Sequence, residues 1–201
     1  DPYRMMTSRS EYRLLLRQDN ADERMTPLGY EIGLVNDSDY KAFLKRKELK
    51  TDEIERLEAT HLGPSNELNK MLTDNDTAAL KSGASIADLI RRPQISYEML
   101  KPFDKERQEL PTEIKQKVET EIKYAGYIEK QAAQVKETVR LESKVLPEDI
   151  NYDDIKGLRL EAIEKLKKIA PKSVGQASRI SGVSPADISV LLIYLEKRGN
   201  L

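Results

Sequence analysis

The chain has 201 residues, of which 34% are charged and only 5% aromatic, and its 34 Lys and Arg nearly balance its 35 Asp and Glu. This balance excludes a strongly basic protein that holds nucleic acid over its whole surface, so any such binding needs a local patch. The absence of cysteine excludes disulfides, thiolate nucleophiles and cysteine-ligated zinc within the chain, and it is consistent with a reducing, cytoplasmic location.

An arginine-rich segment opens the chain, and its basic side chains are candidates for contacts with an anionic ligand. Residues 10–17 form either a helix or a buried strand, since a short apolar run fits both. In the helical case three arginines four residues apart share one face, a spacing that lets guanidinium groups follow phosphates. The alternative is that Glu11, Asp19 and Asp22 hold them in ordinary surface ion pairs. The set consists of Arg4, Arg9, Arg13 and Arg17.

Helical patterns fill the rest of the chain. Capping residues, prolines and glycines delimit helices over residues 27–33, 37–62, 85–92, 96–102, 110–146 and 158–169, followed by a terminal pair. In the segment 110–146, apolar residues recur at steps of three and four from Ile114 to Val139, which predicts one apolar seam. We find no convincing strand beyond the first 25 residues. The predicted fold class is therefore all-α: a helical linker region over 1–72, then a helical bundle over 73–201 with long helices and a terminal helix-turn-helix-like pair.

A glycine in the middle of the longest helix marks a second candidate site. Gly126 costs a helix about 1 kcal/mol relative to alanine, so it suggests that something approaches the backbone closely there. Tyr124 and Tyr127 flank it, with Lys123 and Lys130 beside them. The functional interpretation is a platform for a nucleobase or a partner helix. The simpler interpretation, which the residues alone favour, is that a neighbouring helix packs against the glycine.

Residues 172–201 outline two short helices joined by a glycine turn, as in proteins that read DNA. Ser173 and Ser184 cap the helices, and Gly182 provides a left-handed turn. The second helix, however, carries Asp187 at its start and is nearly all apolar, so it offers base edges no bidentate donors. A DNA-binding regulator is therefore the weaker alternative, and the polar first turn becomes a candidate surface for a protein partner. That turn contains Gly175, Gln176, Ser178 and Arg179.

The usual catalytic machinery is missing from the chain. Its single histidine, His61, falls at an expected helix end and has no second metal ligand or Ser–Asp arrangement nearby. We therefore expect no catalytic, cofactor-binding or metal site. No apolar run approaches the roughly 18 residues that span a bilayer, so no membrane contact is expected. The chain opens inside a strongly patterned segment, and we expect it to be a fragment of a longer protein.

Three motifs together resemble one known family. The stretches 2–22 (PYRMMTSRSEYRLLLRQDNAD), 122–128 (IKYAGYI) and 175–187 (GQASRISGVSPAD) are similar, in the same order, to the C-terminal third of the GidA family. That family comprises FAD-dependent enzymes that install carboxymethylaminomethyl groups on the wobble uridine of tRNA. Met6 and Ser10 stand where the family usually has Phe and Ala. The resemblance runs from the first residue to the last.

The resemblance implies a role for the whole protein and for this part of it. The family's enzymes use FAD, NADH and methylene-tetrahydrofolate, form homodimers and work with a TrmE-type GTPase. Their dinucleotide loop and cysteines precede this region, so residues 1–72 would adjoin the FAD-binding core, while 73–201 would bind tRNA and the GTPase. The tRNA-contact candidates are Arg4, Arg9, Arg13, Arg17, Lys123, Tyr124 and Tyr127; the partner-contact candidates are Gly175, Gln176, Ser178 and Arg179. A domain that only braces the enzyme dimer is the other alternative.

Overall fold

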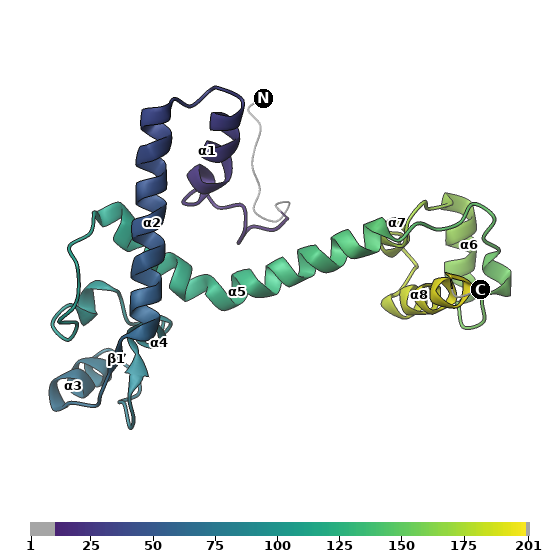
Figure 1. Cartoon of the computed structure of the whole chain (residues 1–201). Coiled ribbons are helices and arrows are strands. Elements are labelled where there is room, and N and C mark those ends of the chain that lie inside the picture. Colours follow the sequence, from purple (N-terminus) through teal and green to yellow (C-terminus); the bar gives the residue numbers. More distant parts are fainter. Residues whose placement is uncertain (1–10, 200–201) are drawn as a thin grey trace, which may run out of the picture. The chain divides into compact units, whose positions relative to one another are not determined.

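The computed structural model describes residues 11–199, which fall into two compact units (Figure 1). One unit extends to Gln131 and the other starts at Ala132, so the division lies inside the long helix α5 (Thr112–Ser143). The boundary expected between residues 72 and 73 falls inside helix α3 (Asn66–Asp74). The all-α fold class is confirmed, because the only strands within the described residues are two residues long each.

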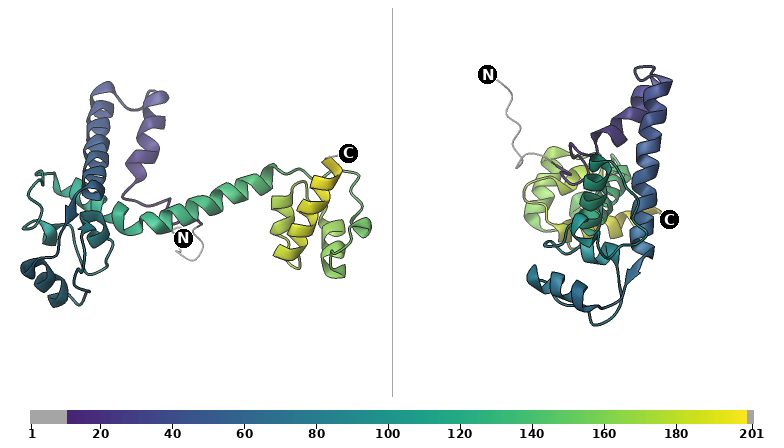
Figure 2. Two further views of the ribbon diagram at one scale, coloured as in Figure 1. Left: turned by 60° about the horizontal axis from the view of Figure 1, so that its bottom comes forward. Right: turned by 90° about the vertical axis from the view of Figure 1, so that its left-hand side faces the viewer.

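The first unit is built around α2 (Asp37–Ala59) and the first part of α5 (Figure 1, Figure 2). Its other elements are α1 (Ala21–Glu31), β1 (His61–Leu62), α3, β2 (Ala84–Ser85), α4 (Ile86–Ile90) and the 3₁₀ turn η2 (Glu98–Leu100). The two strands pair antiparallel, with His61 opposite Ser85. Apolar side chains from α2, α3, α4 and α5 form the core, among them Leu57, Leu72, Leu89 and Ile114.

A network of charged and polar side chains lies beside this core. Glu53 of α2 accepts hydrogen bonds from Arg56 over 2.8 Å and from the Tyr97 hydroxyl over 2.6 Å, and Arg56 also donates to Asp104 over 2.7 Å. Burial, together with the hydrogen bond to the Glu53 carboxylate, raises the pKa of Tyr97 above its ordinary value. Leaving one member of such a buried pair unpartnered costs roughly 3–5 kcal/mol. The network therefore fixes α2 against residues 97–104.

Residues 11–17 form a series of turns, so both predictions for this segment, a helix or a buried strand, are wrong over the described part. Tyr12 has a φ of +52°, in the left-handed region that interrupts regular structure. The N–H groups of Leu14 and Leu15 both donate to Oε1 of Gln131 on α5, over 3.0 and 3.2 Å. A side chain thus takes part in satisfying donors that carbonyls would satisfy in a helix. The arginines of this segment consequently do not share a helical face.

Several helix limits also differ from the predicted ones. α1 begins at Ala21 and contains Pro27, although its end is as expected, since Gly33 has a φ of +78° and donates to the Tyr30 carbonyl over 3.0 Å. α2 ends at Ala59 rather than near residue 62, because the next residues enter β1. α3 has no counterpart among the predicted helices. The continuous seam predicted for α5 is buried at Ile114, Val118 and Ile122 and becomes partly or largely exposed after them.

The second unit comprises the end of α5, the 3₁₀ turn η3 (Tyr152–Asp154), α6 (Leu160–Ile169), α7 (Val174–Ser178) and α8 (Pro185–Gly199). The predicted terminal pair is confirmed. Ser173 Oγ accepts the Gln176 N–H over 3.1 Å, and Gly182 has a φ of +99°. Ser184 and Asp187 cap α8 reciprocally, each accepting the other's backbone N–H. The unit's core includes Leu146, Tyr152, Leu166, Val174, Ala177, Ile188 and Leu191.

Candidate functional site

The structure describes two of the four arginines at the start of the chain, because Arg4 and Arg9 lie outside residues 11–199. Arg17 is engaged internally: its Nε donates to Asp19 Oδ1 over 2.9 Å and its Nη1 to the Leu14 carbonyl over 2.6 Å. The ion-pair interpretation therefore holds for Arg17. Arg13 is exposed and forms no ion pair with any residue from 11 to 199. Of Arg13 and Arg17, Arg13 is therefore the one that can meet an anionic ligand.

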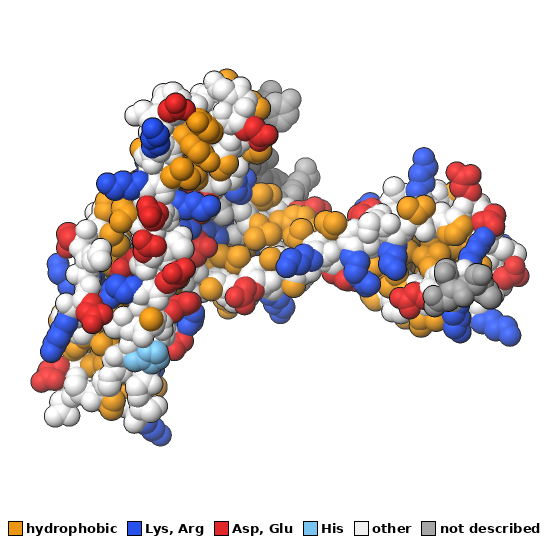
Figure 3. All heavy atoms as spheres, viewed as in Figure 1, with side chains coloured by type: hydrophobic (Ala, Val, Ile, Leu, Met, Phe, Trp, Pro, Cys, Tyr) orange, Lys and Arg blue, Asp and Glu red, His pale blue; other side chains and the backbone are white. Residues whose placement is uncertain are grey.

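The middle of α5 carries an exposed aromatic pair, on a part of the helix where Figure 3 shows hydrophobic side chains gathered. Tyr124 and Tyr127 are 45% and 64% exposed, with ring centroids 6.5 Å apart and planes inclined at 55°. A Cβ added to Gly126 between them would meet nothing within 4 Å. The interpretation in which a neighbouring helix packs against this glycine is therefore wrong among the described residues. The two rings are themselves exposed, so a planar group can lie on them.

The two lysines beside the tyrosines differ in their availability. Lys123 is engaged, because its Nζ donates to Glu119 Oε1 over 2.8 Å and to the Pro93 carbonyl over 3.4 Å. Lys130 is exposed, and no carboxylate between residues 11 and 199 pairs with it. Lys130 is therefore the lysine of the two that can neutralise a phosphate near the rings.

Gln131 brings the arginine segment to the same place. Residues four apart lie on one helix face, so Gln131 lies on the face of Tyr127. Its hydrogen bonds to the Leu14 and Leu15 N–H groups hold the turn that precedes Arg17 against α5. Two sites predicted separately, far apart in the chain, are thus joined. The tyrosine platform, as we call this surface, comprises Arg13, Tyr124, Tyr127 and Lys130.

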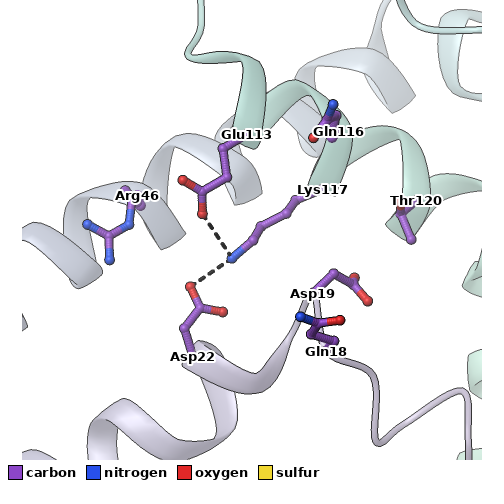
Figure 4. Close-up of a pocket in the computed structure, with 8 residues that line it drawn as sticks. All are labelled: Gln18, Asp19, Asp22, Arg46, Glu113, Gln116, Lys117 and Thr120. Atoms are coloured by element: carbon purple, nitrogen blue, oxygen red, sulfur yellow. Dashed lines mark hydrogen bonds and ion pairs between the residues drawn. The ribbon is translucent and has the colours of Figure 1, made fainter.

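A nearby open hollow of about 900 Å³ between α1, α2 and α5 has the opposite electrostatic character (Figure 4). Lys117 Nζ lies 2.7 Å from Asp22 Oδ2 and 3.6 Å from Glu113 Oε1. Partial burial would by itself raise the pKa of Asp22, but the hydrogen bond from Lys117 lowers it below the ordinary value. The lining, three acids against two bases, does not suit a polyanion. It consists of Gln18, Asp19, Asp22, Arg46, Glu113, Gln116, Lys117 and Thr120.

In the second unit, the candidate partner surface at α7 is largely satisfied from within. Arg179 Nη1 donates to Glu142 on α5, and Glu142 also accepts from Ser173 Oγ over 3.0 Å. The hydrogen bond from Arg179 is the main cause that holds the pKa of Glu142 below its ordinary value. Gly175 is buried rather than outward-facing, because a Cβ there would lie 2.5 Å from Glu142 Cδ. No local pattern marks Glu142 as its neighbour.

The two polar side chains of α7 are exposed but already hydrogen-bonded. Gln176 Oε1 accepts the Lys172 N–H over 2.8 Å, and Ser178 Oγ donates to the Gly175 carbonyl over 2.8 Å. A partner at this surface would meet a preformed turn whose polar groups are oriented by these bonds.

Helix α8 lacks the side chains of a DNA-reading helix. Asp187 is buried, where it accepts from Arg159 Nη2 and Ser184 Oγ, each over 2.7 Å, so it does not face outward as an acid. The exposed side chains of the first turns are Pro185, Ala186, Ser189 and Ile193. None of them can form a bidentate contact with a base edge.

The remaining candidate, His61, lies just beyond α2 in β1. It is exposed, with Nδ1 2.9 Å from the Ala59 carbonyl oxygen. Across residues 11–199, no three His, Asp or Glu side chains are arranged to hold a metal ion. Over the same range, no helix combines the length and the apolar character that crossing a membrane requires.

Comparison with known proteins covers nearly the whole chain. Residues 37–132 match the family model described as the tRNA modifying enzyme MnmG/GidA C-terminal helical domain. Residues 134–201 match the model described as the C-terminal helical bundle of the same enzymes. The two matches adjoin where the compact units divide.

Curated relatives and solved structures extend this similarity. Proteins named tRNA uridine 5-carboxymethylaminomethyl modification enzyme MnmG, from Caldicellulosiruptor saccharolyticus and Clostridium novyi, are each 53% identical over 197 residues, or 98% of this chain. The chain covers 32% and 31% of their lengths, less than a third in both cases. The form II crystal structure of Aquifex aeolicus GidA matches 97% of the chain and 30% of its own, with a TM-score of 0.60 and 37% identity.

Proposed function

The chain belongs to the MnmG/GidA family of tRNA-modifying enzymes, as its C-terminal helical region, and from this premise we propose that it binds tRNA through the tyrosine platform. For the whole protein we propose the reaction in the relatives' name, carboxymethylaminomethyl modification of a tRNA uridine. The observation that carries the proposal is the exposed pair Tyr124 and Tyr127 on α5, whose ring centroids lie 6.5 Å apart. The unstacked bases of an RNA loop can lie on such aromatic faces.

Charge on the platform supports the same ligand. Arg13 and Lys130 are exposed and have no ion pair among residues 11–199, so both can contact phosphates. The near-zero net charge of the chain makes this local arrangement necessary, because no general basic surface attracts RNA. Of the other predicted contacts, Arg17 and Lys123 are held by internal bonds to Asp19 and Glu119. Arg4 and Arg9 remain proposals on sequence resemblance alone.

We place FAD and NADH, the cofactors proposed for the whole protein, outside these residues. A dinucleotide pyrophosphate needs a glycine-rich turn that leads from a strand to a helix N-terminus. Within residues 11–199 the strands are two residues long, and β2 runs directly into α4 without such a turn. The described residues therefore do not fit a dinucleotide, and no step of the redox chemistry is assigned to them.

Titration of unmodified tRNA with this chain, followed by fluorescence anisotropy at several salt concentrations, tests the platform. Tyr127→Ala should weaken binding roughly 5- to 150-fold, since stacking contributes about 1–3 kcal/mol per base, whereas Tyr127→Phe should retain it. Arg13→Ala and Lys130→Ala should each reduce the salt slope by about 0.7–0.9. Lys70→Ala, at an exposed lysine on α3, is the matched control. Equal affinity of wild type and Tyr127→Ala would exclude the platform.

The second unit we propose as the docking region for a TrmE-type GTPase, with Gln176, Ser178 and Arg179 as contacts and Gly175 as the position that lets Glu142 pack beneath them. In a pull-down with the GTPase, Arg179→Ala should weaken capture. Glu142→Gln removes the same internal ion pair but leaves the guanidinium for the partner, so capture should persist. Loss in both variants would mean that the ion pair merely supports the fold. The homodimer that we propose for the whole protein does not depend on this docking region.

A further inference from the structure

Helix α1 and the turns before it lie outside the core of the first unit. From residue 11 to residue 42 no side chain is buried, and Phe43 of α2 is the first that is. The buried residues of the core cluster begin at Leu57. Figure 1 shows α1 beside the first half of α2, away from α3 and α4. Apolar burial therefore contributes little to holding residues 11–31, which we call the strap, in place.

Ion pairs hold the strap to helices α2 and α5. Lys50 of α2 is the central cation: its side chain is only 7% exposed, and its Nζ lies 2.8 Å from Glu23 of the strap and 3.4 Å from Glu121 of α5. Glu121 in turn lies 3.8 Å from Nη2 of Arg17, which again belongs to the strap. Removing one charge from such a row is destabilising, because it leaves a neighbouring charge largely buried and without a partner.

Hydrogen bonds within the strap join its helix to the turns before it. Nη2 of Arg24 in α1 donates to the Arg17 carbonyl over 3.2 Å. Nδ2 of Asn20, at the start of α1, donates to the Leu15 carbonyl over 3.0 Å. Because these bonds lie inside the strap, they are kept when it moves as a whole. The turns and the helix therefore form one unit.

The remaining attachment of the strap lies next to its connection with α2. The ring of Tyr30 stacks on that of Tyr40, with centroids 4.0 Å apart, and the Tyr30 hydroxyl donates to Asp37 Oδ1 over 2.9 Å. Both partners follow closely in the sequence, so this contact does not hold the far end of the strap. Between them lies Gly33, with a φ of +78°, as a pivot.

We propose that the strap opens as one unit while the core of the first unit stays folded, and that the ion pair between Glu23 and Lys50 is the latch that keeps it closed. Opening moves Arg13 away from α5, because the hydrogen bonds from the strap to Gln131 break. The closed strap alone brings Arg13 to the tyrosine platform, so its opening regulates that site. This regulation rests on the proposed function, whereas the opening itself does not.

Hydrogen exchange of the free chain, followed by NMR at increasing urea concentrations, tests the opening. Amides of α1 should exchange through an opening that has a larger equilibrium constant and a weaker urea dependence than that of α3 and α4, because less surface becomes exposed. Two results overturn the proposal. If α1 exchanges with the same constants as the core, the two unfold together; if α1 exchanges like an unfolded peptide, no latch holds it.

Glu23→Gln tests the latch from the side of the strap and leaves Lys50 paired with Glu121. The opening constant of α1 should rise about tenfold, while exchange in α3 and α4 stays the same. Glu31→Gln is the matched control on the same helix, since Glu31 is exposed and has no ion pair among residues 11–199; it should change the constant less than about threefold. Added to Lys50→Met, Glu23→Gln should have little further effect. Additive effects would mean that this pair is not the latch.

Exchange in the presence of tRNA tests the link between the strap and the platform. Saturating unmodified tRNA should reduce the opening constant of α1 at least about fivefold, because it binds the closed form, and should do so less in Arg13→Ala. If tRNA binds and the opening of α1 is unchanged, the strap does not regulate the platform. If tRNA does not bind, the proposed function and this regulation both fail, and the exchange of the free chain still decides whether the strap opens.

Discussion

Gly126 in the first unit and Gly175 in the second mark two surfaces that look alike in sequence and differ in structure. Each glycine interrupts a helical motif and has polar and aromatic or basic neighbours. A Cβ placed on Gly126 would have nothing within 4 Å, whereas at Gly175 the Glu142 carboxyl group fills that space at 2.5 Å. The first surface is open to a ligand, and the second is closed by its own chain.

The difference shows that a glycine within a helix does not by itself indicate that another group packs against the backbone. The packing has to be seen in the structure. At Gly175 that group is Glu142, which also binds Ser173 and Arg179. At Gly126 the described residues supply none. Breaking the internal contacts of the second unit should therefore reduce stability, while changes at the platform should reduce binding.

The largest effect on stability is expected for Asp187→Ala in the second unit. The substitution removes the acceptor of Arg159 and Ser184, and with it the reciprocal cap of α8. Loss of a helix cap with its buried hydrogen bonds should lower the free energy of unfolding by about 1–3 kcal/mol. Denaturant titration followed by circular dichroism measures this free energy. Hydrogen exchange should show that the loss of protection lies in α6–α8. Asp149→Ala, which removes only an exposed ion pair with Arg198, should leave both unchanged.

Acid should act on the same group. The Arg159 hydrogen bond lowers the pKa of Asp187 well below its ordinary value of 3.8, aided by Ser184. A carboxylate with a lowered folded pKa stabilises the protein fully above its unfolded pKa, and this stabilisation is lost as the pH falls toward the folded pKa. The second unit of the wild type should therefore lose stability more steeply between about pH 5 and pH 2 than that of Asp187→Asn. Thermal melting curves of both proteins across this pH range test the prediction. An equal loss of stability in the two proteins would mean that Asp187 is not the group responsible.

Elements with local signals could be predicted from the sequence. The caps at Ser173 and Ser184 and the turn at Gly182 are determined by residues close in sequence, and the structure confirms them. The long helix α5 is likewise delimited by its apolar repeat and by the proline at 111.

Features that depend on distant residues could not be predicted. The turn over residues 11–17 is held by Gln131, more than a hundred residues away, so a local apolar run indicates a helix or a strand instead. β1 shortens α2 because it pairs with β2, which no pattern near Ala59 indicates. Gly126 is open because no described residue packs against it, and no sequence pattern indicates such an absence of contacts.

The contrast between the two glycines is tested directly by alanine. Gly126→Ala should stabilise the chain by about 0.5–1 kcal/mol, because alanine favours a helix and the site is open. Gly175→Ala should show no such gain, since its Cβ displaces Glu142 from Ser173 and Arg179. Melting temperatures of the two variants, measured side by side, give the comparison. Equal stabilisation would mean that Glu142 moves aside freely and that the second surface is less closed than its contacts indicate.

The smallest effect is expected for a substitution in the hollow of Figure 4. This substitution tests whether the ion pair in the hollow only stabilises the fold or belongs to a ligand site. Asp22→Asn weakens the contact with Lys117, which is partly exposed, so the loss of stability should stay below about 1 kcal/mol and shrink further in salt. Because three acids face two bases there, the hollow should not bind RNA in either form. The tRNA affinity of Asp22→Asn should therefore equal that of the wild type, while Lys130→Ala on the platform lowers it. A clear gain in affinity for Asp22→Asn would move the tRNA contact from the tyrosine rings to this hollow.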